Sequence, residues 1–193
     1  MSYTEPLDPG VFYHIYNRGN NGENLFVEET NYQYFLDQYT KHIVPRVNTY
    51  AYCLLRNHFH LLIRVRENQT SFKIPLSKSF SNLFNAYARA FNRRYGRHGS
   101  LFEKPFKRKS IRHQNQLIQT VYYIHANPVN HGFVDDMDDW PYSSYSIYFS
   151  DKDTTLSRED CLSWFDSQDG FADYHRSMRL SQLDQDLISG FES

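Results

Sequence analysis

The hydrophobic residues of the first 130 positions follow two alternating periods. Runs rich in β-branched and aromatic residues at 11–17, 47–55, 58–65 and 105–111 predict strands. Apolar residues that recur every three or four positions predict amphipathic helices over 30–44, 80–95 and 114–125. Pro45 and Gly96 end the first two helices. We expect the third helix to end before Asn127-Pro128, because the residue that precedes a proline avoids helical geometry.

The order of these elements predicts the fold class. Only Arg56 and Asn57 separate the second strand from the third, which favours a hairpin. The complete order, β-α-β-β-α-β-α, predicts an α+β sandwich in which helices cover one face of an antiparallel or mixed sheet. The other face of the sheet would then be free for a site.

The character of the chain changes after residue 145. There the sequence becomes acidic and loses its regular patterning, apart from a helix start predicted at 157–160. We therefore expect one folded domain over residues 1–148 and an acidic, partly helical C-terminal appendage over 149–193.

Composition excludes several classes of protein. The 193 residues include no run of the ~18 consecutive apolar residues that a membrane-spanning helix needs. The first ten residues are polar and do not resemble a signal peptide. The two cysteines, Cys53 and Cys161, lie far apart and have no metal-ligand spacing, which argues against a thiolate zinc site and against a disulfide framework. We expect a cytoplasmic protein with no membrane partner.

The formal net charge of −1 hides a strong asymmetry. Residues 1–112 carry 17 Lys and Arg against 8 Asp and Glu, whereas residues 113–193 carry 4 against 14. The cations are densest over 89–112, where nine of them accompany a single acid, Glu103. This stretch fits a site for a polyanion such as nucleic acid. It fits equally well a solvated surface whose charges pair with the acidic C-terminal residues.

A His-x-His pair lies on the third predicted strand. Period-two alternation places Phe59, Leu61, Ile63 and Val65 on one face, and His58 and His60 on the opposite face. Residues two apart on a strand lie about 7 Å apart, so both imidazoles can reach one metal ion. The alternative is that both histidines are ordinary polar residues of a sheet.

A tyrosine stands on the polar face of the third predicted helix. At about 100° per residue, Tyr123 lies opposite the apolar side of the helix, on the same face as Asn127. The neighbouring Tyr122 lies at the edge of the apolar side and is the rival candidate for chemistry. A metal held by His58 and His60, with Asn127 completing the shell, could polarise a phosphodiester while the phenol attacks phosphorus.

These motifs resemble a known family, the single-tyrosine HUH transposases, and most closely the REP-associated tyrosine transposases. The resemblance is carried by segments 57–62 (NHFHLL), 123–129 (YIHANPV) and 140–144 (WPYSS). Segments 14–19 (HIYNRG) and 99–102 (GSLF) extend it, so that it covers about residues 11–145.

The resemblance implies a ferredoxin-like catalytic domain with the histidine pair on an inner strand. It implies metal-dependent nicking and rejoining of single-stranded DNA at hairpin-forming sequences. His58 and His60 would hold Mg²⁺ or Mn²⁺, and Tyr123 would form a 5′-phosphotyrosine. Asn127 would be the third metal ligand, at a position where insertion-sequence members commonly have Gln.

We choose the candidate contacts to the DNA backbone by their positive charge and not from a motif. They are Arg18, Arg56, Arg93, Arg94, Lys107 and Arg108. The partner would be single-stranded or hairpin DNA. The sequence leaves open whether the active site is assembled within one chain or across a homodimer.

Two other functions remain open at this point. A non-catalytic module could bind structured nucleic acid through the same basic and aromatic surface. A metal-dependent hydrolase could use His58 and His60 to activate water. The sequence shows no carboxylate close to the histidine pair to act as a base, so the hydrolase ranks last.

Overall fold

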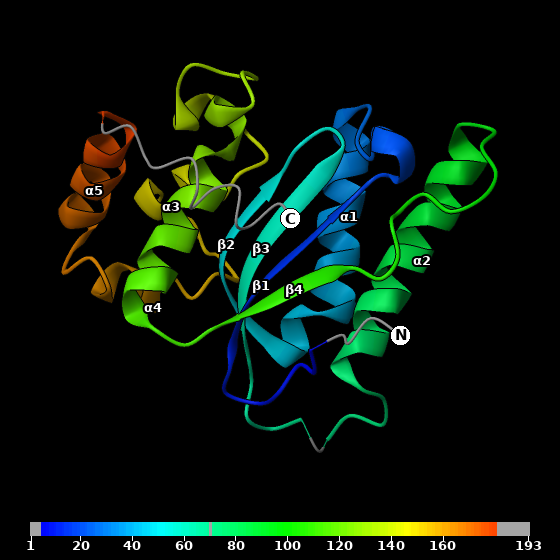
Figure 1. The fold of residues 1–193 in the computed structure, drawn as a ribbon, viewed down its shortest axis with the longest axis horizontal. Helices are drawn as coiled ribbons and strands as arrows, with labels where there is room; N and C mark the ends of the chain where they lie inside the picture. Colours follow the sequence, from blue (N-terminus) through cyan, green and yellow to red (C-terminus); the bar gives the residue numbers. More distant parts are fainter. Residues whose placement is uncertain (1–4, 70, 181–193) are drawn as a thin grey trace.

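The structure is a computed structural model that describes residues 5–69 and 71–180. Its centre is a sheet of four strands, β1 (Phe12–Arg18), β2 (Val47–Leu54), β3 (His58–Val65) and β4 (Lys107–Ile111), in the order β2-β3-β1-β4. The longer helices are α1 (Glu29–His42), α2 (Leu76–Arg94), α3 (Gln114–Asn130) and α5 (Gln168–Leu180). Short helical segments are α4 (Arg158–Ser163), η1 (Asn20–Gly22), η2 (Val44–Arg46), η3 (Met137–Asp139) and η4 (Ser146–Phe149). In Figure 1, α1 and α2 lie on one side of the sheet and α3 and α5 on the other.

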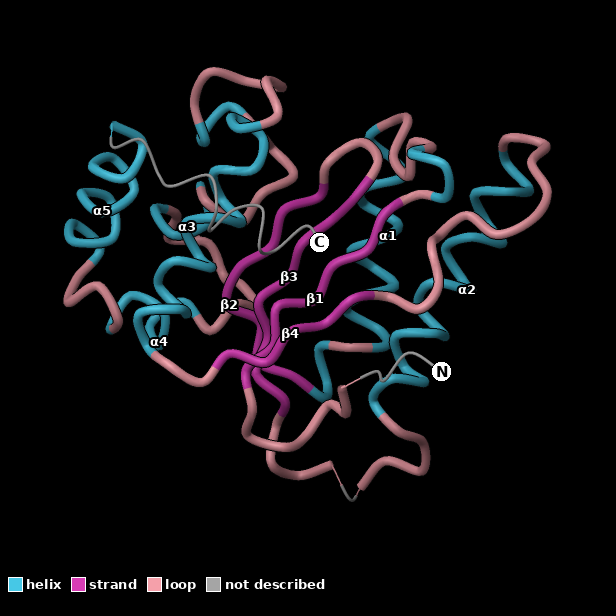
Figure 2. The backbone as a smooth tube through the Cα atoms, in the orientation of Figure 1, coloured by secondary structure: helices cyan, strands magenta, loops and turns pink. Residues whose placement is uncertain are grey.

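Each pair of neighbouring strands is antiparallel, β2 with β3, β3 with β1, and β1 with β4. The four strands run side by side in Figure 2, with helices on both sides. The order β-α-β-β-α-β with β1 and β3 in the centre is the ferredoxin-like arrangement. The predicted α+β sandwich is therefore confirmed, and the histidine pair lies on an inner strand, β3.

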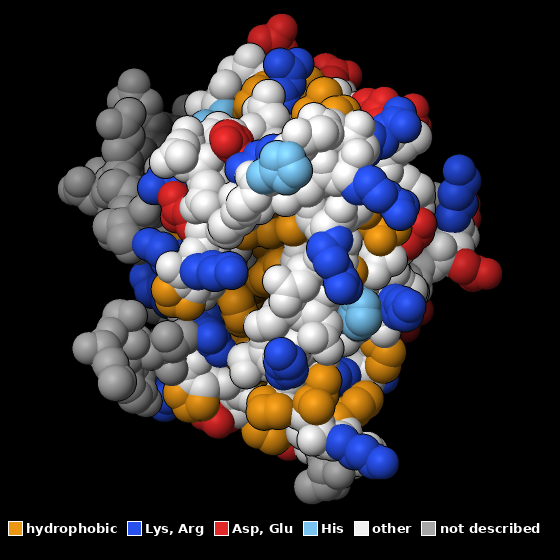
Figure 3. Space-filling model, turned by 90° about the vertical axis from the view of Figure 1, so that its right-hand side faces the viewer, with side chains coloured by type: hydrophobic (Ala, Val, Ile, Leu, Met, Phe, Trp, Pro, Cys, Tyr) orange, Lys and Arg blue, Asp and Glu red, His pale blue; other side chains and the backbone are white. Residues whose placement is uncertain are grey.

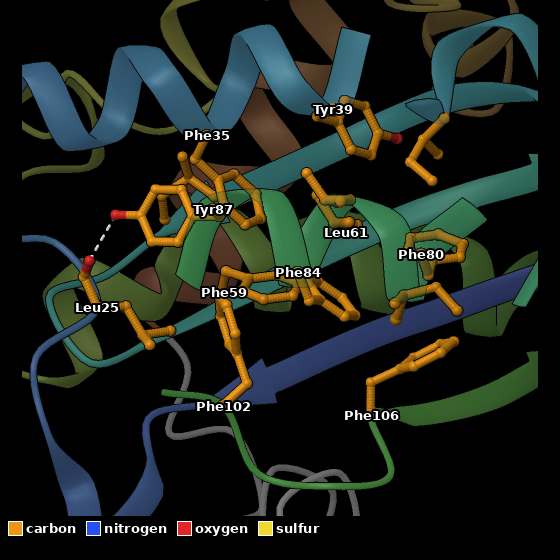
Figure 4. Close-up of a cluster of buried hydrophobic side chains, with 14 of the residues drawn as sticks. Leu25, Phe35, Tyr39, Phe59, Leu61, Phe80, Phe84, Tyr87, Phe102 and Phe106 are labelled. Carbon is orange, nitrogen blue, oxygen red and sulfur yellow. Dashed lines mark hydrogen bonds between the residues drawn. The ribbon is translucent and has the colours of Figure 1, made fainter. Parts of the chain in front are cut away.

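An aromatic core fixes the first face of the sheet against α1 and α2. Phe59 of β3 is fully buried and contacts the rings of Phe35 from α1 and Phe84 from α2. Figure 4 shows this cluster, in which the Tyr87 hydroxyl donates a hydrogen bond of 2.6 Å to the backbone oxygen of Leu25. Because a shift of one residue would expose this set, the core locks the register of β3 and directs His58 and His60 to the other face.

The second face of the sheet is covered along part of its width, whereas the sequence had suggested a free face. Helix α3 packs against β2 and β3. Cys161 and Phe171 from the C-terminal part join Tyr50 of β2 in a second core. Part of the expected appendage thus packs into a core that includes residues of the sheet, while 181–193 lie outside the described residues.

The third helix continues through Pro128 to Asn130, so the expected end before Asn127-Pro128 is wrong. Pro128 is buried, and the turn closes with hydrogen bonds from the His131 and Phe133 amides to the Asn127 and Pro128 carbonyl oxygens. A buried proline near a helix end loses one backbone hydrogen bond, which the packing of its ring offsets. The continuation keeps Asn127 in helical register with Tyr123.

In the part of the chain that the structure describes, none of the helices has the length and apolar character needed to cross a lipid bilayer.

Candidate functional site

Strands β1 and β3 bring the histidine pair to the second face of the sheet. His58 is opposite Arg18 and His60 is opposite Tyr16 in the antiparallel register. The two imidazole rings lie with their centroids 5.1 Å apart and nearly perpendicular. His60 is buried and His58 is partly exposed.

Hydrogen bonds orient both rings through their Nδ1 atoms. His60 Nδ1 lies 3.0 Å from Nε2 of the buried His14, and His58 Nδ1 lies 2.8 Å from Asn57 Oδ1. Nε2 is therefore the nitrogen that each ring can offer to a ligand. Nε2 of His60 is buried and has no hydrogen-bond partner among the residues that the structure describes.

Burial keeps both rings neutral at neutral pH. It lowers the pKa of His58 to about 4, with His131 and Arg18 acting in the same direction and Asn127 in the opposite one. Burial also lowers the pKa of His60 well below its ordinary value, and the neighbouring imidazoles lower it further. The neutral imidazole is the form that binds a metal, so the site needs no deprotonation at pH 7.

Helix α3 places Tyr123 against these rings. Tyr123 is 5% exposed and lies edge-on to His60 and His14, with ring centroids 5.3 and 5.8 Å away. The rival Tyr122 instead packs against α5, where it contacts Tyr174 and His175. Of the two adjacent tyrosines of α3, Tyr123 thus lies against the histidines and Tyr122 does not.

Asn127 lies one helical turn beyond Tyr123. Its Nδ2 donates a hydrogen bond of 3.0 Å to the backbone oxygen of Tyr123. Its Oδ1 is buried and has no hydrogen-bond partner among the described residues. Asn127 also acts on His58, where it opposes the lowering of the pKa by burial.

These donors fit a divalent cation. The described residues contain no group of three or more His, Cys, Asp or Glu side chains that could hold a metal. They do contain two neutral imidazoles and an amide oxygen, of which His60 Nε2 and Asn127 Oδ1 are buried polar atoms with no hydrogen-bond partner. Buried polar atoms are nearly always paired, and a cation would satisfy both.

A pocket of about 250 Å³ opens beside the histidine pair. Its walls come from β1, the β2–β3 turn and β3, the loop before β4 with the start of that strand, and the residue after α3. The lining residues are Tyr16, Asn17, Arg18, Asn57, His58, His60, Glu103, Lys107 and His131. Tyr123 and Asn127 are not among these residues.

The structure adds residues that the sequence had not indicated as site residues. His14 and Tyr16 lie on alternate positions of β1, and only the pairing of β1 with β3 brings them to His60. His131 lies edge-on to His58, with ring centroids 4.9 Å apart. Glu103 also lines the pocket, so the expectation of no carboxylate near the pair is wrong. Glu103 Oε1 accepts a hydrogen bond of 2.6 Å from Arg18 Nε.

The six candidate DNA contacts fall into separate places. Arg18 and Lys107 line the pocket. Arg56 is exposed at the tip of the β2–β3 hairpin, with its guanidinium 5.5 Å from the Phe133 ring. The others lie apart from the histidines: Arg93 and Arg94 are exposed at the end of α2, where Arg94 pairs with Glu28, and Arg108 covers the Phe106 ring.

Two of three comparisons with known proteins find similar proteins. No family model matches the chain. A protein of Haemophilus influenzae named "Putative REP-associated tyrosine transposase" is 35% identical over 102 residues, which are 50% of this chain and 58% of that protein. The chain thus spans less than two thirds of that relative. A solved structure described as a REP-associated tyrosine transposase bound to a REP hairpin matches with a TM-score of 0.58 and 22% identity, over 77% of this chain and 84% of that chain. The relative's sequence, together with a shared fold, confirms that this chain is similar to REP-associated tyrosine transposases.

Proposed function

We propose that this protein nicks and rejoins single-stranded DNA at hairpin-forming sequences by metal-dependent transesterification on Tyr123. The observation that carries the proposal is the contact of the Tyr123 phenol ring with His60, whose buried Nε2 has no hydrogen-bond partner among the described residues. The named relatives support a role on hairpin DNA. Cys53 and Cys161 are free thiols, which suits the reducing cytoplasm that we propose as the location.

His58, His60 and Asn127 would hold the cation, Mg²⁺ or Mn²⁺. When bound, it would withdraw electron density from a non-bridging oxygen of the scissile phosphate and so make phosphorus more electrophilic. His14 would hold His60 in the required tautomer, because a proton on His60 Nδ1 leaves Nε2 as a lone-pair donor.

The chain's own residues carry the covalent step. The Tyr123 phenol loses its proton and forms a bond from its oxygen to phosphorus, while the bond from phosphorus to the 3′ oxygen breaks and that oxygen takes up a proton. The products are a 5′-phosphotyrosine and a free 3′-hydroxyl, and attack by a 3′-hydroxyl in the reverse direction rejoins the strand. Because a free tyrosine has a pKa near ~10, positive charge close to the site, such as that of Arg18 and Lys107, would favour the phenolate.

In-line displacement requires the attacking and leaving oxygens to lie on opposite sides of phosphorus. Tyr123 does not line the pocket. We assign the pocket to the strand that carries the leaving 3′-hydroxyl, with Arg18 and Lys107 contacting its phosphates.

A second candidate function is metal-dependent hydrolysis, which the presence of Glu103 in the pocket favours more than the sequence did. A carboxylate there could activate water, although its short contact with Arg18 already occupies one oxygen. Hydrolysis leaves no protein–DNA bond, so an adduct that survives SDS would exclude it as the nicking step.

The test uses a labelled DNA hairpin with single-stranded flanks, taken from the region around the protein's own gene, with Mg²⁺ or Mn²⁺. We expect a covalent adduct on a denaturing gel for the wild type, none for Tyr123→Phe, and an undiminished band for the matched control Tyr122→Phe. Binding of the hairpin by the wild type without an adduct under any metal would overturn transesterification and support the alternative, a non-catalytic module for structured nucleic acid.

A further inference from the structure

A chain of hydrogen bonds crosses the second core from β2 to α5. Ser144 lies beside the edge strand β2, where its amide donates to the Tyr52 carbonyl oxygen and the Tyr52 amide donates to Ser144 Oγ, each at 2.9 Å. Ser144 Oγ lies 2.8 Å from His125 Nε2 on α3, and His125 Nδ1 lies 3.0 Å from His175 Nε2 on α5. His175 Nδ1 lies 2.8 Å from the Phe171 carbonyl oxygen, one helical turn earlier. The chain of hydrogen bonds therefore joins the sheet, α3 and α5.

The two ends of this chain fix the direction of each hydrogen bond in it. A carbonyl oxygen can only accept, so His175 Nδ1 carries a proton and its Nε2 accepts a hydrogen bond from His125 Nδ1. Burial lowers the pKa of both imidazoles, that of His175 to about 4, so each ring is neutral at pH 7 and carries one proton. His125 Nε2 therefore accepts from the Ser144 hydroxyl, whose contact with the Tyr52 carbonyl oxygen is longer, at 3.2 Å. Both rings are thus in the Nδ1–H tautomer.

The side chains in this chain are sealed from solvent. Ser144 and His125 are fully buried, and His175 is 1% exposed. The rings of Phe171 and Tyr145 pack against both imidazoles. Because water does not reach these groups, the loss of one partner leaves a buried donor or acceptor unpaired. Hydrogen bonds at both ring nitrogens of His125 therefore restrict the rotation of α3 about its axis and its distance from the sheet.

His125 lies midway in sequence between the proposed nucleophile and the proposed third metal ligand. At about 100° per residue, Tyr123 and Asn127 are each about 200° from His125 on α3, so both lie on the opposite face of the helix, about 40° apart. A rotation of α3 would move the phenol and the amide together relative to His60. The hydrogen bonds that hold the far face of α3 to β2 and to α5 therefore set how the Tyr123 ring meets His60.

We propose that His175 is a positioning residue for the nicking reaction, which acts through His125 to hold α3 in the orientation that brings Tyr123 and Asn127 to the histidine pair. The proposal rests on the proposed function and extends it to the C-terminal part of the chain, which the sequence had suggested to be an appendage. Helix α5 would then help to align the nucleophile, although none of its side chains touches the DNA in this proposal.

Substitutions in this chain of hydrogen bonds leave the basic surface of the protein unchanged. In Figure 1, α5 lies at the opposite end of the molecule from α2, and Figure 3, which faces the α2 side, shows numerous Lys and Arg side chains there. Ser144 and His175 are buried and carry no charge at pH 7. Because phosphate contacts dominate affinity for DNA, we expect the loss of a positioning contact to reduce the nicking rate and to leave hairpin affinity almost unchanged.

The test measures three quantities, which are the single-turnover nicking rate at saturating hairpin, hairpin affinity by fluorescence anisotropy and Mn²⁺ affinity by titration calorimetry. His175→Phe keeps an aromatic ring but removes the acceptor for His125, whereas His175→Gln restores an acceptor oxygen. Ser144→Ala breaks the chain at its other end and replaces His175→Phe if that variant does not fold. The matched control is Phe165→Leu, which trims a buried ring that contacts His175 without a side-chain hydrogen bond. Thermal melting shows whether each variant is folded.

For folded His175→Phe and Ser144→Ala we expect the nicking rate to fall by about 10- to 100-fold, because a displacement of about 1 Å at a reacting group has an effect of this size. Mn²⁺ affinity should fall as well, because Asn127 moves with Tyr123, and His175→Gln should recover most of both losses. Phe165→Leu should lower the melting temperature but nick at the wild-type rate. A wild-type nicking rate in folded His175→Phe, or an equal loss in Phe165→Leu, would overturn the positioning role.

The direction of the hydrogen bonds can be tested without any activity. Nitrogen NMR of the imidazole rings should show His125 and His175 in the Nδ1–H tautomer, and an Nε2–H tautomer on either ring would overturn the proposed chain. These measurements also separate the two proposals. A wild type that forms no adduct but shows both tautomers and the expected order of Mn²⁺ affinities refutes only the transesterification. Equal adduct formation by the wild type and all variants refutes only the positioning role.

Discussion

His14 offers the sharpest test of the metal site, because it contacts a proposed ligand but no proposed substrate. Its Nε2 lies 3.0 Å from His60 Nδ1, and both side chains are buried. Burial, with Lys109 acting in the same direction, lowers the pKa of His14 to about 3, so its ring is neutral and can accept the hydrogen bond from His60. Replacing His14 by Ala removes that acceptor and frees the His60 ring to turn or to change tautomer.

The expected magnitude follows from this single hydrogen bond. Removing a hydrogen bond that orients a metal-binding histidine lowers metal affinity by about 10- to 100-fold, or roughly 1.4 to 2.7 kcal/mol. The buried donor left on His60 costs about a further 1–3 kcal/mol of folding free energy. His14→Gln retains a side-chain oxygen that can accept the bond, so it should recover part of the metal affinity and part of the folding free energy.

The assay is Mn²⁺ binding by titration calorimetry on folded protein, with thermal melting run in parallel. The exposed His98→Ala serves as a control that also removes one imidazole. We expect the Mn²⁺ affinity to follow the order wild type and His98→Ala, then His14→Gln, then His14→Ala. Equal Mn²⁺ affinity in the wild type and in a folded His14→Ala protein would refute the orienting role.

Three further outcomes follow from the structure. His58→Ala and His60→Ala should each abolish nicking and leave hairpin affinity largely intact, because phosphate contacts dominate affinity; unaltered nicking in either variant would remove the metal-site argument. Burial lowers the pKa of His175 to about 4, so below pH ~6.5 the unfolded chain binds a proton that the folded chain does not, and the free energy of unfolding should fall by up to about 1.4 kcal/mol per pH unit toward pH 4 for this residue. Denaturant titrations should show a shallower pH dependence for His175→Gln, and an identical dependence would contradict the assignment. Phe59→Ala should cost about 3–5 kcal/mol of folding free energy because it leaves a cavity among buried rings, and a cost below about 1 kcal/mol in chemical denaturation would show that this core is not tightly packed.

The faces of β3 could be predicted because both of them carry a strong signal. Alternate residues from Phe59 to Val65 are all apolar and enter the first core. His58 and His60 therefore lie on the opposite face of the strand. The same logic separated Tyr123 from Tyr122 on α3, and the structure places their rings in different surroundings. Where one face of a strand or helix is strongly apolar, the local sequence therefore predicts which residues lie on the opposite face, where a site can form.

The remaining features depend on contacts between distant parts of the chain. His14 reaches His60 only through the β1–β3 register, and Glu103 enters the pocket through a loop 85 residues beyond its partner Arg18. No local pattern encodes either contact. The end of α3 shows the reverse case, in which a sound local rule about Pro128 is overridden because the ring is buried by tertiary packing.

The most direct test of the central claim is to identify the residue joined to DNA. The adduct formed on the hairpin substrate would be digested with nuclease and trypsin, and the modified peptide sequenced by fragmentation mass spectrometry, which must distinguish Tyr123 from the adjacent Tyr122. The account predicts a nucleotide linked through its 5′ phosphate to Tyr123. A linkage at Tyr122, or at any other residue, would contradict it.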